Sequence, residues 1–187
     1  MKVYLFDANG LYTSEYICQE SPLEPGQYIV PNECMTVAPI IQAGFWPVVV
    51  DGKWTYEEDH RGEIVYSTTT GFPQEWTELG PLSADVTLIP KPDANYEWNG
   101  TEWVFSINLW RQHLTCTAYQ FRAALNELGK RQDVESAVAA SSSQDLKDAW
   151  EYGTTYERLS PYVLDMQTAL GSTDAEVDAI FELAVTK

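Results

Sequence analysis

A break in composition near Trp110 constrains the fold more than any other feature of the sequence. Nine of the ten prolines and six of the seven tryptophans lie at or before Trp110, and Pro161 is the only proline after it. Proline is excluded from helix interiors and from the centres of sheets, so the first part favours short strands joined by turns. The second part is rich in alanine, which favours helices. The sequence therefore predicts an α+β chain, with antiparallel β-hairpin modules first and a small C-terminal helical bundle after them.

Two dipeptides mark the turns of the clearest predicted hairpins. Asp51-Gly52 lies between residues 46–50 and 53–56, and Asn99-Gly100 lies between residues 96–98 and 101–105. Both dipeptides tolerate the positive φ angles of the type I′ turn, which joins adjacent antiparallel strands. We expect two further hairpins, with turns at residues 7–10 and 67–71.

The predicted hairpins recur in the same order along the chain. Thr36-Val37-Ala38-Pro39 parallels Thr87-Leu88-Ile89-Pro90 at an offset of 51 (87 − 36), and Trp54 parallels Trp103 at an offset of 49 (103 − 54). A duplicated unit is one interpretation, and two unrelated sets of hairpins is the other. We expect one β-hairpin module at residues 1–56, a second at 57–110 and a helical domain at 111–187. The charged residues 57–62 are interpreted as a connector.

Boundary signals divide the second part into short helices. Serine or threonine followed three residues later by a polar or acidic residue is typical of a helix N-terminus, and Ser-Pro is another such signal. The starts predicted in this way are Thr117 with Gln120, Ser142 with Asp145, Ser160-Pro161, and Thr173 with Glu176. The last predicted helix has the clearest apolar stripe, so we expect Ile180 and Phe181 to lie in the core.

The chain is strongly acidic, with a formal net charge of −17. This charge repels phosphate backbones and anionic lipid headgroups, so no nucleic acid and no membrane is expected as a partner. Of the 28 acidic residues, 16 lie before Arg111 and 12 lie after it. An inhibitor that mimics nucleic acid is an alternative, but it needs acidic side chains arranged regularly on one face, and this scatter argues against it.

No pattern of residues predicts catalysis or metal binding. His60 and His113 have no second histidine at ligand spacing, and Cys18, Cys34 and Cys116 match neither a disulfide framework nor a zinc site. Cys116 lies near His113, but no third group completes a catalytic set. We therefore expect no enzyme activity, no cofactor and no metal.

Tryptophans of the hairpin region are the candidates for a partner-binding surface. Exposed aromatic side chains give a large contact area at low entropic cost and dominate binding hot spots. The candidates are Trp46, Trp54, Trp76, Trp98 and Trp103. The competing interpretation is that these side chains fill a thin core or form cross-strand pairs.

The order of several motifs resembles that of phage tail fibre assembly proteins. The motifs, spread over roughly residues 1–105, are Tyr4-Leu5-Phe6-Asp7-Ala8-Asn9-Gly10-Leu11-Tyr12, Pro22-Leu23-Glu24-Pro25-Gly26-Gln27-Tyr28, Thr36-Val37-Ala38-Pro39, Asp51-Gly52-Lys53-Trp54 and Gly62-Glu63-Ile64-Val65-Tyr66. The resemblance implies a protein that binds the distal, trimeric part of a tail fibre. It would act in the host cytoplasm as an assembly chaperone, or stay in the virion tail as a structural component. A carbohydrate-binding module that contacts a host-surface glycan is the alternative.

Overall fold

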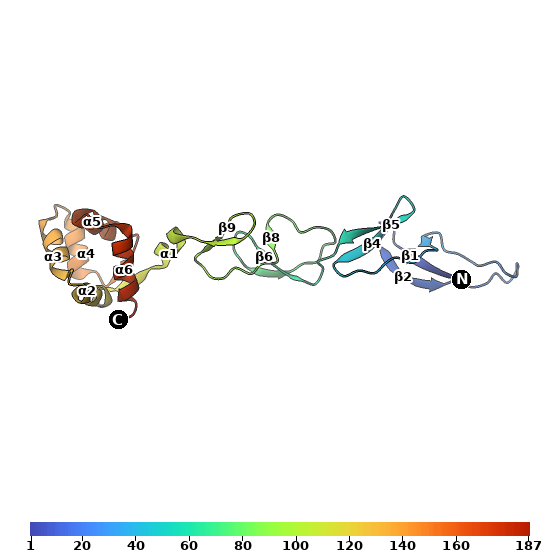
Figure 1. Ribbon diagram of the computed structural model, residues 1–187, viewed down its shortest axis with the longest axis horizontal. Helices are drawn as coiled ribbons and strands as arrows, with labels where there is room; N and C mark the ends of the chain where they lie inside the picture. Colours follow the sequence, from blue (N-terminus) through green and yellow to red (C-terminus); the bar gives the residue numbers. More distant parts are fainter. The chain divides into compact units, whose positions relative to one another are not determined.

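The computed structural model describes residues 1–187, which form two compact units, Met1–Lys91 and Pro92–Lys187. Strands make up the regular structure of the first unit, and most helices lie toward the C-terminus (Figure 1). The predicted α+β class is therefore confirmed. The division into modules at residues 1–56, 57–110 and 111–187 stays a prediction.

The first unit consists of small antiparallel sheets. Strands β2, β1 and β3 form one sheet in that order, β4 and β5 form a hairpin, and β7, β6 and β8 form a third sheet. The bounds are β1 (Lys2–Phe6), β2 (Tyr12–Ile17), β3 (Cys34–Met35), β4 (Phe45–Val50), β5 (Lys53–Glu58), β6 (Ile64–Ser67), β7 (Pro73–Glu75) and β8 (Val86–Thr87).

The hairpin of β4 and β5 turns at Asp51-Gly52, as predicted. Asp51 has a φ of 51° and Gly52 a φ of 70°, the two positive angles that a type I′ turn requires. The register then pairs Val50 with Lys53 and continues to Phe45 with Glu58. Residues 57 and 58 therefore belong to β5, and the interpretation of residues 57–62 as a connector is wrong for these two positions.

Gly10 ends the turn between β1 and β2. Its φ is 83°, and a Cβ atom at this position would lie 2.6 Å from the backbone oxygen of Val49. The amide of Val49 also donates a 2.8 Å hydrogen bond to the carbonyl of Gly10. Glycine is therefore needed here both for its backbone conformation and for the close approach of the turn to β4.

The two three-stranded sheets share one topology. In each, the first strand along the chain lies in the centre, and a two-residue strand pairs with its free side: Met35 with Tyr4, and Thr87 with Tyr66. A hairpin follows each sheet along the chain. Met35 and Thr87 thus take the same place in the two sheets, at an offset of 52 residues (87 − 35). The sequence comparison aligned Thr36 with Thr87 at an offset of 51, which differs from the structure by one residue.

The second unit begins with one more hairpin. Its elements are β9 (Tyr96–Trp98), β10 (Trp103–Phe105), α1 (Ile107–His113), β11 (Thr115–Thr117), α2 (Ala118–Glu127), α3 (Arg131–Ala140), α4 (Gln144–Tyr152), β12 (Thr155–Glu157), α5 (Pro161–Leu170) and α6 (Asp174–Ala184). The loop at Asn99-Gly100 is longer than the predicted two-residue turn, because Trp98 pairs with Trp103 and residues 99–102 lie between them. The Asn99 side chain accepts hydrogen bonds from the amides of Thr101 and Glu102, which stabilises this longer loop.

Helix starts follow the capping signals closely. Thr117 and Thr173 each form the predicted capping box. Ser160 occupies the N-cap position of α5 without a side-chain capping hydrogen bond, and Pro161 lies in the first turn. The start of α4 was predicted one residue early: Ser143, rather than Ser142, accepts the hydrogen bond from the amide of Leu146.

Helices α2 to α6 lie together in the second unit (Figure 1), and one hydrophobic core holds them in place. The stripe of α6 lies in this core as predicted, with Ile180 3% and Phe181 0% exposed. Its other large members are Phe121, Leu125, Val134, Val138, Leu146, Tyr156, Val163, Met166 and Val177. No helix of the structure combines the length and the apolar character that a membrane span needs.

Candidate partner-binding surface

Trp46 and Trp54 meet at one aromatic cluster of the first unit. Both come from the β4–β5 hairpin, and the ring of Tyr12 lies 6.4 Å from Trp46 and 5.9 Å from Trp54, measured between centroids. The indole N–H of Trp46 donates to the backbone carbonyl of Tyr12 at 3.1 Å. Part of each tryptophan remains accessible, so the two side chains both pack internally and face solvent.

Arg61 covers one face of Trp46. Its guanidinium carbon lies 4.7 Å from the ring centroid, and its Nε and NH2 groups donate to the two carboxylate oxygens of Asp59 at 2.7 and 2.8 Å. The hydrogen bond from Arg61 also holds the pKa of Asp59 below its ordinary value. A sugar ring could not stack on the face of Trp46 that Arg61 covers.

The same hairpin fixes a loop that exposes aliphatic side chains. The indole N–H of Trp54 donates to the carbonyl of Val37 at 2.8 Å, and the Tyr56 hydroxyl accepts from the amide of Ile40 at 2.9 Å. Val37 is nevertheless 66% exposed, and Ile40 and Ile41 are each 70% exposed. We call residues 37–41 the aliphatic loop. It is an apolar surface held in place by two aromatic side chains.

Trp76 follows β7 and lies beside a backbone pairing. Its amide donates to the carbonyl of Glu63, and its carbonyl accepts from the amide of Gly62. Its indole nitrogen is buried and has no hydrogen-bond partner. An unpartnered buried donor is uncommon and costs about 1–3 kcal/mol. Trp76 makes no ring contact with Trp46 or Trp54, so these three candidates do not form one aromatic patch.

Trp98 and Trp103 pair across the β9–β10 hairpin of the second unit. Their ring centroids are 5.3 Å apart in an edge-to-face arrangement. Trp103 is only 8% exposed, whereas Trp98 is half-buried. Cross-strand packing therefore accounts for most of the surface of Trp103, and Trp98 keeps the more accessible ring.

Comparison with known proteins identifies the family. The chain is 36% identical over 95 residues to a prophage tail fiber assembly protein homolog, TfaR, of Escherichia coli K12, covering 49% of this chain and 50% of the relative. It is 35% identical over 95 residues to the tail fiber assembly protein of Escherichia phage lambda, covering 49% of each. A second prophage homolog from Escherichia coli K12, TfaE, is 30% identical over 150 residues, covering 78% of this chain and 68% of the relative. The chain belongs to the tail fibre assembly family.

Coverage differs between these tail fibre assembly relatives. The matches span about half the length of TfaR and of the phage lambda protein, and about two thirds of TfaE. No protein-family model and no solved structure matches the sequence. The family and the phage tail context are thus established.

Two features of this tail fibre assembly family member bear on catalysis. Burial raises the pKa of the Cys116 thiol to about 11, so the thiol stays protonated at neutral pH. His113 is the last residue of α1, and its Nδ1 atom lies 2.8 Å from the side-chain oxygen of Asn95. A thiolate–imidazole pair between Cys116 and His113 is therefore not formed, and no group of side chains has the arrangement of a metal site.

An ion-pair network in the helical part could not be predicted from local sequence patterns. Arg158 is 0% exposed and donates from Nε to Asp178 at 2.6 Å and from NH2 to Asp174 at 2.9 Å. Arg111 of α1 binds the same Asp178 carboxylate, with NH2 at 2.7 Å. Hydrogen bonds from the side chains of Gln167 and Arg158 hold the pKa of Asp174 below its ordinary value. Asp178 thus connects α1 to the helical core.

Proposed function

We propose that this chain binds a tail fibre protein during fibre assembly in the host cytoplasm, and that the aliphatic loop of the first unit makes the central contact. The observation that carries the proposal is an apolar surface on a loop whose position is fixed by Trp54 and Tyr56. Curated relatives of the chain are tail fiber assembly proteins by name, which supports the fibre as the partner.

The energetics favour a contact of this kind. Fully burying one exposed valine or isoleucine side chain contributes about 1.5–3 kcal/mol. Val37, Ile40 and Ile41 are each more than half exposed, so a partner could remove most of their surface from water. A loop that is already fixed loses less conformational entropy on binding than a free one. Trp46 and Trp54 would extend this contact through their accessible edges. Trp76 and Trp98 would make contacts of their own, and Trp103 would support Trp98 from within.

The physical need for such a partner follows from how a fibre forms. Before trimerisation, the distal part of a fibre chain exposes apolar surface and unpaired strand edges, which promote aggregation. The aliphatic loop would cover part of the apolar surface, and the net charge of −17 would keep the complex soluble. The chain would act as an assembly chaperone whether or not it later stays on the virion tail.

Co-expression of the full chain with a tail fibre protein tests this proposal. The double variant Ile40→Asp with Ile41→Asp places two charges on the aliphatic loop and should abolish co-purification and lower the yield of soluble trimeric fibre. Leu164→Asp, at an exposed apolar position of α5, is the matched control and should leave both unchanged. Full co-purification of the folded double variant would refute the proposed contact.

Retention in the virion is a separate question with its own measurement. Quantitative mass spectrometry of purified particles should show peptides of this chain at a fixed ratio to the fibre protein if the chain is a tail component. A chaperone that leaves after assembly should be absent from particles but present in complexes isolated from infected cells.

A further inference from the structure

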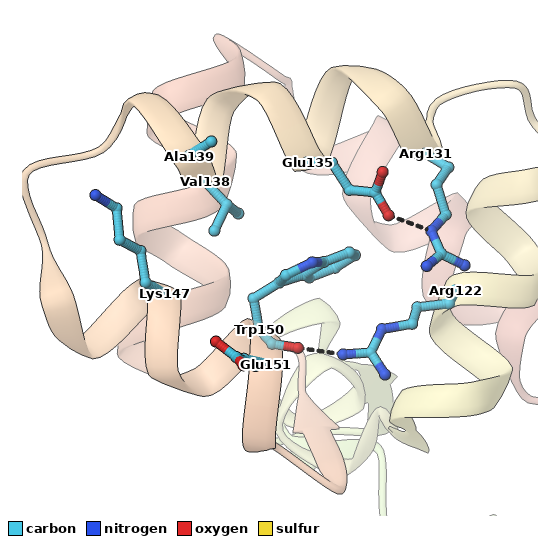
Figure 2. Close-up of a pocket in the computed structure, with 8 residues that line it drawn as sticks. All are labelled: Arg122, Arg131, Glu135, Val138, Ala139, Lys147, Trp150 and Glu151. Atoms are coloured by element: carbon cyan, nitrogen blue, oxygen red, sulfur yellow. Dashed lines mark hydrogen bonds and ion pairs between the residues drawn. The ribbon is translucent and has the colours of Figure 1, made fainter.

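A hollow of about 490 Å³ opens between helices α2, α3 and α4 of the second unit (Figure 2). Arg122 comes from α2, Arg131 from α3, and Lys147 and Trp150 from α4. Figure 2 shows the guanidinium groups of Arg122 and Arg131 at one end of the hollow, with the indole ring of Trp150 reaching toward them. None of these residues belongs to the aromatic candidates of the hairpin region.

The cations of this hollow are less neutralised than the others of the same unit. Arg131 pairs with Glu135 at 2.7 Å, Arg122 donates to the backbone carbonyl of Trp150, and Lys147 has no ion-pair partner. Elsewhere in the unit each lysine and arginine has a carboxylate partner: Arg111, Lys130, Arg158 and Lys187. With three cations and two carboxylates along its wall, the hollow is locally positive in a chain of net charge −17.

Apolar groups form the rest of the wall. The ring of Trp150 stacks at 12° on Tyr156, with centroids 6.4 Å apart, and Arg122 lies 5.0 Å from the Trp150 ring centroid. Val138 adds an aliphatic surface. Because Tyr156 is buried in the core, the Trp150 ring is held in a fixed orientation. The hollow therefore combines two adjacent guanidinium groups with a rigid apolar floor.

We propose that this hollow binds a carboxylate-bearing segment of a partner protein. The carboxylate would lie between Arg122 and Arg131, because guanidinium groups bind carboxylates through paired, charge-assisted hydrogen bonds. An apolar side chain next to the carboxylate would pack on Trp150 and Val138. This gives the helical unit a binding role of its own, which does not depend on the aliphatic loop.

The chemistry of the hollow selects a peptide carboxylate over a nucleic acid. A nucleic acid carries a dense line of phosphates that the net charge of −17 repels along its whole length. A single carboxylate senses mainly the charges within about 8 Å at physiological salt, where the local excess is positive. The carboxylate could be an acidic side chain or a chain terminus, and both sources share this chemistry.

Titration of the full chain with small probes tests the assignment. The indole N–H signals of the seven tryptophans are followed by nuclear magnetic resonance, and Trp150→Phe identifies the signal of Trp150. N-acetyl-leucyl-glutamate amide supplies a side-chain carboxylate, N-acetyl-leucine supplies a terminal one, and N-acetyl-leucyl-glutamine amide is the neutral control. Inorganic phosphate is the fourth probe.

We expect one or both carboxylate probes to shift the Trp150 signal in a saturable manner, and the stronger probe identifies the source. Arg122→Gln and Arg131→Gln should each weaken this binding about tenfold or more. Lys130→Gln is the matched control, because it makes the same change of charge one position away, where the side chain pairs with Glu176; it should alter binding less than about twofold.

Three results would overturn the assignment. The Trp150 signal could fail to respond to either carboxylate probe, or it could respond equally to the neutral probe. Inorganic phosphate could bind as tightly as the peptides, which would indicate a general anion site. Arg122 binds the backbone of another helix, whereas Arg131 pairs with Glu135 of its own helix, so Arg131→Gln keeps the test valid if Arg122→Gln disturbs folding.

Discussion

Removing the charge of Asp178 should destabilise the helical unit more than any other single change in its ion-pair network. Asp178 is the only carboxylate that binds both Arg111 and Arg158 through well-shielded contacts, since its side chain is 10% exposed and that of Arg158 is 0% exposed. In Asp178→Asn, an amide N–H replaces one acceptor oxygen and faces guanidinium N–H groups. The buried charge of Arg158 would then depend on Asp174, whose side chain is 54% exposed.

The expected magnitudes follow from these exposures. Leaving one charge of a buried pair without its partner costs about 3–5 kcal/mol, so Asp178→Asn should lower the free energy of unfolding by that amount. Arg158→Met should cost less, about 2–3 kcal/mol, because Asp178 keeps Arg111 as a partner while hydrogen bonds to Gln167 and Asp174 are lost. Asp174→Asn should cost the least of the three, because solvent screens the charge at this exposed position.

Urea unfolding of the full chain, followed by far-ultraviolet circular dichroism, isolates the helical transition because all six helices lie in the second unit. The loss of stability should be largest for Asp178→Asn, smaller for Arg158→Met and smallest for Asp174→Asn. A neutral or stabilising Arg158→Met, or equal losses for the two aspartate variants, would refute this order.

Four further predictions follow from the packing and from the shifted pKa values. Gly10→Ala should destabilise the first unit by several kcal/mol, because its Cβ would lie 2.6 Å from a backbone atom. Gly52→Ala has open space around it and should cost about 1–2 kcal/mol, the cost of a left-handed backbone. Equal losses of stability in thermal melts would contradict this difference. Phe181→Ala should cost about 3–5 kcal/mol in urea unfolding through the cavity left in the core, and an unchanged midpoint would mean that the side chain is not buried. Cys116, with its pKa raised to about 11, should not react with a thiol reagent at pH 8 until the chain unfolds; rapid labelling of the native chain would show otherwise. The pKa of Asp174 is lowered in the folded chain, so its contribution to stability is complete above the ordinary carboxyl pKa of 3.8. That contribution is lost as the pH falls through the lower pKa of the folded state. The free energies of unfolding of Asp174→Asn and of the wild type should therefore converge in acid.

Local signals predicted the turns and helix starts because each depends on a few neighbouring residues. Asp51-Gly52 gave the correct turn and the correct register of β4 with β5. The capping boxes at Thr117 and Thr173 formed as predicted, since the two hydrogen bonds of a capping box join residues three positions apart. Asn99-Gly100 was a partial failure, because pairing of Trp98 with Trp103 favoured a longer loop over the two-residue turn.

Features that depend on distant residues could not be predicted from one sequence. Strands β11 and β12 pair Cys116 with Tyr156 inside a region whose local composition indicates only helices. Arg158 is an ordinary surface residue by composition, and its burial depends on Asp178, 20 positions later, and on α1. No local periodicity records such a contact, because its partners come together only when the helices pack.

The tryptophans named from the sequence as partner-binding residues stay a prediction. The indole N–H groups of Trp46 and Trp54 donate hydrogen bonds to the backbone of neighbouring segments and hold these segments in place. The exposed side chains of Ile40 and Ile41 were not singled out, since two aliphatic residues in a loop give no periodic signal. The hollow at Trp150 was also missed, because Arg122, Arg131 and Lys147 lie on three different helices.

The order of synthesis divides this chain into an early and a late part. Every sheet of the first unit closes between strands that end by Thr87, so its hairpins can form while the ribosome is still adding residues. The helical unit cannot be completed in this way. Arg111 can bind Asp178, 67 positions later, only after Asp178 has been synthesised, and the core is incomplete until α6 has been added. A nascent chain would therefore carry finished hairpins, and with them the aliphatic loop, before its helical unit exists. A chain truncated before α6 would remain in that state, with its first unit formed and the apolar faces of α2 to α5 left in water.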